Sequence, residues 1–150
     1  MNSVLRIKHR LMQTEHKGFV IEGDEKFSHQ TIAALDLLEL KSPAGYELAR
    51  DYIRRVSKTG KRSGMENFED PPTFYVNDRT VRAGSEWYAS CIVHDAEHAK
   101  KYQEYVRRHP ALGPMLRFAR ILVGRGKKRD AWRFNTQPCW IWNNHHWLNM

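Results

Sequence analysis

The chain has 150 residues, of which 41% are apolar and 28% are charged, and its formal net charge is +8. This length suits a single domain over residues 1–150 with a sizeable core, and no apolar run approaches the ~18 residues of a transmembrane segment. The N-terminus lacks the apolar core of a signal peptide, so we expect a cytoplasmic protein, or one exported without a cleavable signal peptide.

The first elements are predicted from short apolar runs and capping residues. Residues 1–27 form an N-terminal segment, within which residues 18–23 are an apolar run between glycines and predict a strand. The core of the domain, residues 28–134, begins with a helix capped by Ser28. A second helix starts at Ser42-Pro43, with serine as the cap and proline at the first helical position.

The middle of the core alternates between turn signals and regular elements. Residues 58–72 contain two glycines and two prolines, and predict a loop long enough to suggest a functional role. Residues 73–76 carry a strand signal, and the turn after them predicts a return strand over residues 80–82. A long helix is expected over residues 85–108, with Ser85 as its cap and the dipeptide His109-Pro110 as its stop.

The C-terminal part continues with helical segments and ends in an aromatic tail. Helices are expected over residues 111–123 and from residue 129, and residues 135–150 form the tail. The predicted fold class is therefore α+β, a mostly helical single domain with a small β-sheet beside the long helix.

The long helix carries the sequence His94-Asp95-Ala96-Glu97-His98. Positions four apart lie on the same face of a helix, so both imidazoles can bind one metal ion, with a carboxylate beside them to act on a metal-bound water. The zinc-peptidase motif H-E-x-x-H uses this geometry, and Asp95 replaces its glutamate to give H-D-x-x-H. We expect both histidines on the buried stripe of the helix; the alternative is a pair of packed histidines that only form hydrogen bonds.

Two acids compete for the role of catalytic base. Asp95 is the favoured candidate, because it follows the first histidine as the glutamate of H-E-x-x-H does. Glu97 is the other candidate, because H-x-x-E-H is the inverted form of the motif. The alternative for both is a solvated helix acid that faces Lys100 and Lys101.

A catalytic zinc site needs about three protein ligands and an open position. Asp130 is the best candidate for the third, because it is an isolated acid before a small residue on a second helix. A salt bridge to Arg129 or Arg133 is its alternative role. Four further residues are rival ligands: Glu104, His109, His145 and His146.

Residues 87–105 resemble the active-site helix of minimal zinc metallopeptidases of the gluzincin type, within the zincins. The segment Asp130-Ala131-Trp132-Arg133-Phe134 looks like their downstream helix, where an acid before alanine supplies the third ligand. The order of two helices, a loop, a strand and the motif helix is similar to small bacterial effector peptidases.

The resemblance implies a Zn²⁺-dependent hydrolase, a metallopeptidase that acts on a protein or peptide substrate. It assigns the metal to His94, His98 and Asp130, and residues 73–76 to the edge strand that binds substrate. Aspartate replaces the family's glutamate at both the base and the third ligand, so a catalytically altered zincin fold is an alternative.

The basic charge is concentrated in one stretch. Residues 100–133 hold eleven basic side chains and two acidic ones, a local charge of +9, so the rest of the chain carries about −1. Lys127, Lys128 and Arg129 are the predicted contacts with nucleic acid or an anionic surface. A basic nucleic-acid-binding protein or nuclease-type toxin is therefore the alternative function, and a solvated basic face is the simpler explanation.

The only cysteines are Cys91 and Cys139, too few for a disulfide framework, which favours a reducing compartment. With His94 and His145, which follow them at short spacing, they could instead form a structural Cys/His zinc site.

Overall fold

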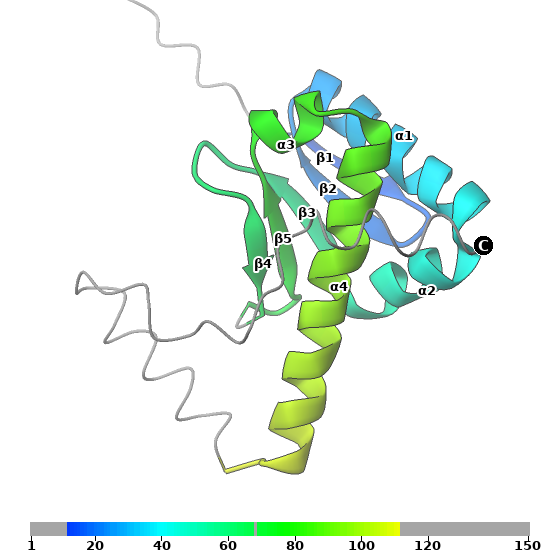
Figure 1. The fold of residues 1–150 in the computed structure, drawn as a ribbon. Coiled ribbons are helices and arrows are strands. Elements are labelled where there is room, and N and C mark those ends of the chain that lie inside the picture. Colours follow the sequence, from blue (N-terminus) through cyan, green and yellow to red (C-terminus); the bar gives the residue numbers. More distant parts are fainter. Residues whose placement is uncertain (1–11, 68, 112–150) are drawn as a thin grey trace, which may run out of the picture.

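The computed structural model describes residues 12–67 and 69–111, and the structural statements below concern these residues (Figure 1). In chain order the elements are β1 (Met12–His16), β2 (Phe19–Gly23), α1 (Glu25–Lys41), α2 (Pro43–Tyr52), β3 (Arg55–Lys58), β4 (Gly64–Glu66), β5 (Thr73–Val76), α3 (Asp78–Arg82) and α4 (Ser85–Arg108). More than half of the described residues are helical, and the strands form a single sheet, so the predicted α+β class is confirmed.

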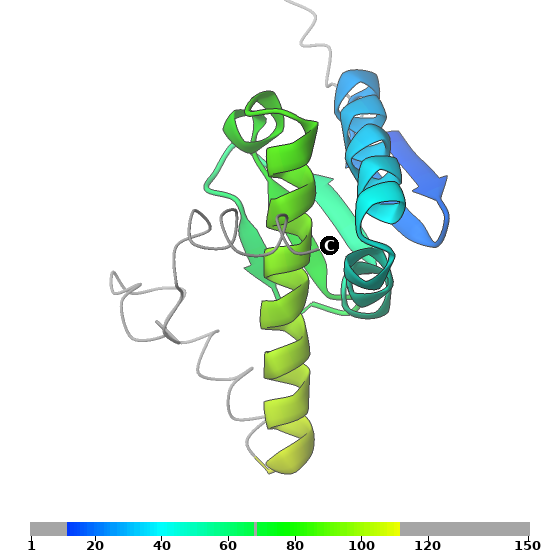
Figure 2. The same ribbon diagram turned by 45° about the vertical axis from the view of Figure 1, so that its right-hand side comes forward.

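The sheet has five strands in the order β1-β2-β3-β5-β4. Its three inner strands are parallel to one another, and each outer strand is antiparallel to its neighbour. Helices α1, α2 and α4 cover the same face of this sheet (Figures 1 and 2). The prediction that residues 73–76 form the edge strand is wrong, because β5 pairs with β3 on one side and with β4 on the other.

Several helix boundaries depend on caps. Ser42 caps α2 as predicted, since its hydroxyl accepts a hydrogen bond from the backbone N–H of Gly45. The first helix begins before Ser28, because the carboxylate of Asp24 accepts a bond of 2.9 Å from the N–H of Phe27. For α4 the cap residue is Gly84, whose φ of +113° suits glycine, and Ser85 is the first helical residue.

Residues 80–82 do not form a return strand. The side chain of Asn77 accepts a bond of 3.0 Å from the N–H of Thr80 and caps the short helix α3 instead. This is the capping behaviour that makes asparagine ambiguous between a turn and a helix start. Strands β2 and β5 were predicted, whereas the sheet also contains β1, β3 and β4.

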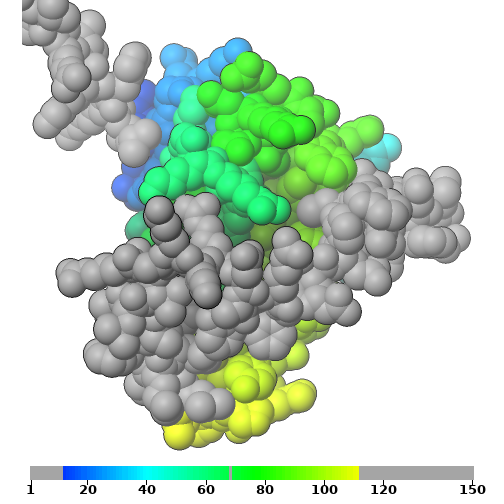
Figure 3. All heavy atoms as spheres, turned by 60° about the vertical axis from the view of Figure 1, so that its left-hand side comes forward, coloured from blue at the N-terminus to red at the C-terminus, as the bar shows by residue number. Residues whose placement is uncertain are grey.

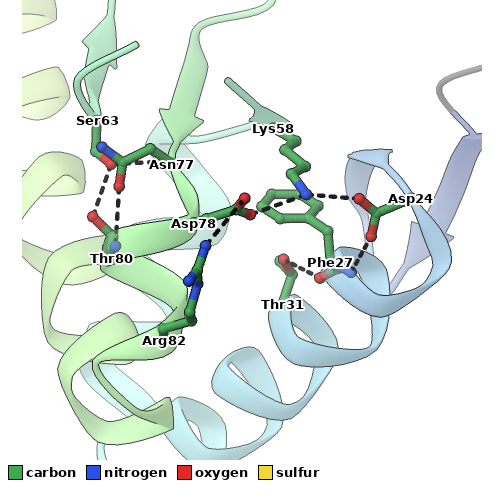
Figure 4. Close-up of polar contacts among 9 residues, drawn as sticks. All are labelled: Asp24, Phe27, Thr31, Lys58, Ser63, Asn77, Asp78, Thr80 and Arg82. Carbon is green, nitrogen blue, oxygen red and sulfur yellow. Dashed lines mark hydrogen bonds and ion pairs between the residues drawn. The ribbon is translucent and has the colours of Figure 1, made fainter. Parts of the chain in front are cut away.

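The carboxyl ends of the parallel strands are closed by an ion-pair cluster (Figure 4). The amino group of Lys58 lies 2.7 Å from the carboxylate of Asp24 and 2.9 Å from that of Asp78. The hydrogen bond from Lys58 lowers the pKa of Asp24, and the bond to Asp24 raises the pKa of Lys58. The cluster therefore ties the starts of α1 and α3 to the end of β3.

A buried pair of hydroxyls joins α1 to α4. The Thr31 hydroxyl donates to the carbonyl oxygen of Phe27 at 2.8 Å, so the Tyr88 hydroxyl donates to Thr31 at 2.9 Å. Tyr88 is only 1% exposed, and this burial raises the pKa of its phenol. The bond fixes the rotation of α4 about its own axis.

This hydrogen bond predicts an asymmetric effect of mutation. Tyr88→Phe leaves Thr31 still bonded to a carbonyl, so the free energy of unfolding should fall by only about 1 kcal/mol. Thr31→Val leaves the buried Tyr88 hydroxyl without an acceptor and should cost about 2–3 kcal/mol. Urea unfolding measures both, and the double variant should recover part of the loss. Equal losses of unfolding free energy in the two single variants would contradict the hydrogen bond from Tyr88 to Thr31.

Candidate metal centre

Helix α4 positions the candidate site. It packs against α1 and α2 and also contacts α3 and the edge strand β4 (Figure 1). The side chains that enter the core from α4 share one face of the helix: Tyr88, Ala89, Ile92, Val93, Ala96 and Ala99. Three of these six residues are alanines, so the helix axis can approach the other elements closely.

The two motif histidines converge on one point. The Nε2 atoms of His94 and His98 are 2.9 Å apart, and the ring centroids are 4.5 Å apart in an edge-to-face arrangement. Two nitrogens that bind one zinc ion tetrahedrally at about 2.0–2.1 Å lie about 3.3 Å apart. The observed separation is that of a direct hydrogen bond and is about 0.4 Å shorter than the zinc value, so the two rings would have to move slightly apart to share a metal ion.

The prediction that both histidines lie on the buried face is met only in part, because they are half-buried and lie outside the core cluster. His94 follows Ile92 by two residues, which places it about 200° around the helix from that core residue. Both histidines are half-buried, whereas Ile92 is fully buried. Trp87 and Cys91 lie on the same side of α4 as the two histidines and pack with the core. Further along the helix, residues on this side are less buried.

The two candidate bases flank the histidine pair on opposite sides. Asp95 is rotated about 100° past His94, and Glu97 is rotated about 100° before His98. Both carboxylates are half-buried. The alternative role for Glu97 was a solvated helix acid that faces Lys100 and Lys101. Within the described residues no ion pair joins Glu97 to either lysine.

The described residues supply two ligands and not a third. Among residues 12–67 and 69–111 no group of three histidine, cysteine or acidic side chains could hold a metal ion. Glu104 points about 120° away from His98, and His109 lies about 16 Å further along the helix axis. The other candidates, Asp130, His145 and His146, lie outside the described residues.

The remaining sequence alternatives also reach beyond the described residues. Cys91 is 7% exposed and belongs to the core cluster, and Cys139, its predicted partner in a Cys/His site, is outside the described part. Lys127, Lys128 and Arg129 are outside it too.

Strand β4, like α3, contacts α4 and was not predicted from the sequence. It lies inside the predicted loop, has only three residues and contacts α4. Its sequence, Gly64-Met65-Glu66, has one large apolar side chain and carries little strand signal.

The half-buried position of the histidines, outside the core cluster, predicts that they contribute little to folding. Without metal, His94→Ala or His98→Ala should change the free energy of unfolding by less than about 1 kcal/mol. Ile92→Ala, on the core face of the same helix, should cost about 2–5 kcal/mol. Urea unfolding in the presence of a chelator measures all three. If the histidine variants lost as much free energy of unfolding as Ile92→Ala, the histidine side chains would have to pack in the core.

Comparison of the chain with protein-family models, curated proteins and solved structures finds no match. The helices in the described part of the chain all fall short of the length and apolar character needed to cross a membrane.

Proposed function

We propose that the protein is a zinc-dependent hydrolase, and within that class a metallopeptidase. The observation that carries the proposal is the convergence of the His94 and His98 Nε2 atoms to 2.9 Å, with a carboxylate on each side. Imidazole nitrogens suit zinc, and both histidines remain partly exposed. The resemblance of the motif to the zincins favours peptide hydrolysis over other hydrolytic reactions.

The residues of α4 take distinct roles in this proposal. His94 and His98 hold the metal, and Asp130 is the proposed third ligand. A zinc ion held there would supply a Lewis acid and lower the pKa of water towards ~7. Asp95 would accept a proton from the attacking water and pass it to the amine that leaves when the peptide bond breaks.

The edge of the sheet suggests how a peptide would be held. β4 is the last strand of the described sheet and contacts the helix that carries the histidines. An extended peptide can add to an edge strand through main-chain hydrogen bonds. We therefore transfer the substrate-binding role from residues 73–76, which lie inside the sheet, to residues 64–66.

Cleavage by variants of the two acids tests the proposal. Asp95→Asn keeps the metal ligands but removes the base, so zinc content should be unchanged and peptide cleavage should fall by roughly 10²–10⁴-fold. Glu97→Gln is the matched control two residues away in the same motif, and should have a mild effect. Turnover of a broad peptide library by the zinc-loaded full chain is the measurement.

Two results would contradict these roles. Loss of cleavage in Glu97→Gln but not in Asp95→Asn would assign the base to Glu97 and the motif to its inverted form. No cleavage by the zinc-loaded wild-type chain would favour a catalytically altered zincin fold.

A further inference from the structure

We propose that residues 112–129 of this chain dock on the side of the sheet that faces away from the helices. Helices α1, α2 and α4 cover one side of the sheet, and α3 contacts α1 and α4 (Figures 1 and 2). None of the helices in residues 12–67 and 69–111 lies over the other side, which we call the open sheet face. Its charged side chains are Glu15, Glu22, Arg55, Glu66 and Glu69.

The alternation of side chains along the strands defines this face. Ile21, Val56 and Phe74 pair across β2, β3 and β5, are fully buried and belong to the core cluster. Successive side chains of a strand point to opposite sides of a sheet. The neighbours Arg55 and Tyr75 therefore point to the open sheet face.

The sheet itself favours a second covering layer. Its three inner strands are parallel, and parallel strands occur mostly where both faces of the sheet are covered. At the centre of the open sheet face the short polar side chains of Ser57 and Thr73 are buried. A parallel centre with buried residues on this side is typical of a sheet that has a layer on each face.

The open sheet face is acidic. Glu22 is paired with Arg55, whose Nε lies 3.4 Å from its carboxylate, and Arg55 is the one basic residue at the outward positions of the described strands. The Tyr75 hydroxyl contacts both carboxylate oxygens of Glu69, at 2.9 and 3.1 Å, which holds this loop residue at the face. With Glu15 and Glu66 the face has four acids and one base, so its formal charge is −3.

Glu15 and Glu66 stand at the two ends of one row across the sheet, which we call the cross-strand row. The register joins five residues in this order: Glu15, Val20, Arg55, Thr73 and Glu66. Five strands that lie about 4.8 Å apart span about 19 Å. A segment of 18 residues is about 27 Å long even when it is helical, so residues 112–129 are long enough to follow the whole row.

Residues 112–129 carry the complementary charge. They contain six basic side chains and no acidic one: Arg117, Arg120, Arg125, Lys127, Lys128 and Arg129. Residues 12–111, by contrast, contain 15 basic and 16 acidic side chains. Most of the positive surplus of the chain therefore follows directly on a domain whose open sheet face is negative, and opposite charges attract the two.

The described chain ends beside the correct edge of the sheet. Gln103 of α4 lines the same cavity as Gly18, Arg54 and Pro72, which immediately precede β2, β3 and β5. Helix α4 therefore passes the amino ends of the parallel strands. It continues beyond them in Figure 1, and in Figure 3 its yellow end stands at the foot of the molecule. The cross-strand row contains the first residues of β3 and β5, so it is the row nearest to this end of α4.

Docking is compatible with the proposed third metal ligand and does not depend on it. The docked segment ends at residue 129, and Asp130 follows. Strand β4 is the edge of the open sheet face and also contacts α4. A segment that leaves the face at β4 therefore brings Asp130 towards the helix that carries His94 and His98.

Zero-length crosslinking of the full chain tests the docking. A carbodiimide joins a carboxylate to a lysine amine that touches it, and mass spectrometry identifies the joined residues. The two lysines of the segment should be joined to Glu66 and Glu69, beside the β4 edge, about tenfold more often than to Glu47 and Glu86, because docking raises their local concentration there. Glu47 and Glu86 are exposed acids on the helices and serve as controls. The preference should disappear at about 1 M salt, where charges are screened within about 3 Å.

Removal of the acids at the ends of the cross-strand row should release the segment. Trypsin cleavage after the arginines of residues 112–129 should become about fivefold faster in E15Q/E66Q, because cleavage follows the population of the open form. The matched control is E47Q/E86Q, which loses the same charge from the helices and should be cleaved at the wild-type rate.

Three outcomes would overturn the proposal. Crosslinks spread equally over the acids of the face and of the helices would show that the segment does not dock. Crosslinks that form only between two chains, and increase with protein concentration, would assign the face to a second copy. Equal acceleration of cleavage in E47Q/E86Q would show that only net charge matters.

Discussion

The rotation of α4 about its own axis determines where every candidate functional group points. That rotation is set by the buried hydrogen bond from Tyr88 to Thr31 and by the alanines that pack against the core. With this side of the helix turned inwards, His94 and His98 lie half-buried beside the core and outside the core cluster. The same constraint sets the directions of Asp95 and Glu97, so the packing of α4 places both histidines and both acids of the motif.

The helices could be predicted because their signals are local. Ser42-Pro43 marks the start of α2, and the stretch without glycine or proline marks α4. Strands β1, β3 and β4 could not be predicted in the same way, because each has only three to five residues and little apolar alternation. Strand β3 also depends on pairing with β2 and β5, which are distant from it in the sequence. The α3 helix was missed because Asn77 can begin either a turn or a helix.

The candidate site was predictable in its spacing but not in its orientation. The i, i+4 rule predicts that His94 and His98 meet, and they do. The apolar side chains of α4 do not show which side of the helix enters the core. Small alanines make much of the core contact, while the larger aromatic residues lie on a different side and give a stronger apolar signal. Spacing also cannot choose between Asp95 and Glu97, since both flank the pair at similar angles.

The central claim is that His94 and His98 together hold one zinc ion. X-ray absorption at the zinc edge, on the full chain loaded with one equivalent of zinc, tests it most directly. The account predicts two imidazole nitrogens at about 2.0–2.1 Å, oxygen in the remaining positions, and loss of the imidazole signal in His94→Ala. Sulfur scattering at about 2.3 Å would assign the metal to a Cys/His site instead, and a wild-type chain that retains no zinc would contradict the account outright.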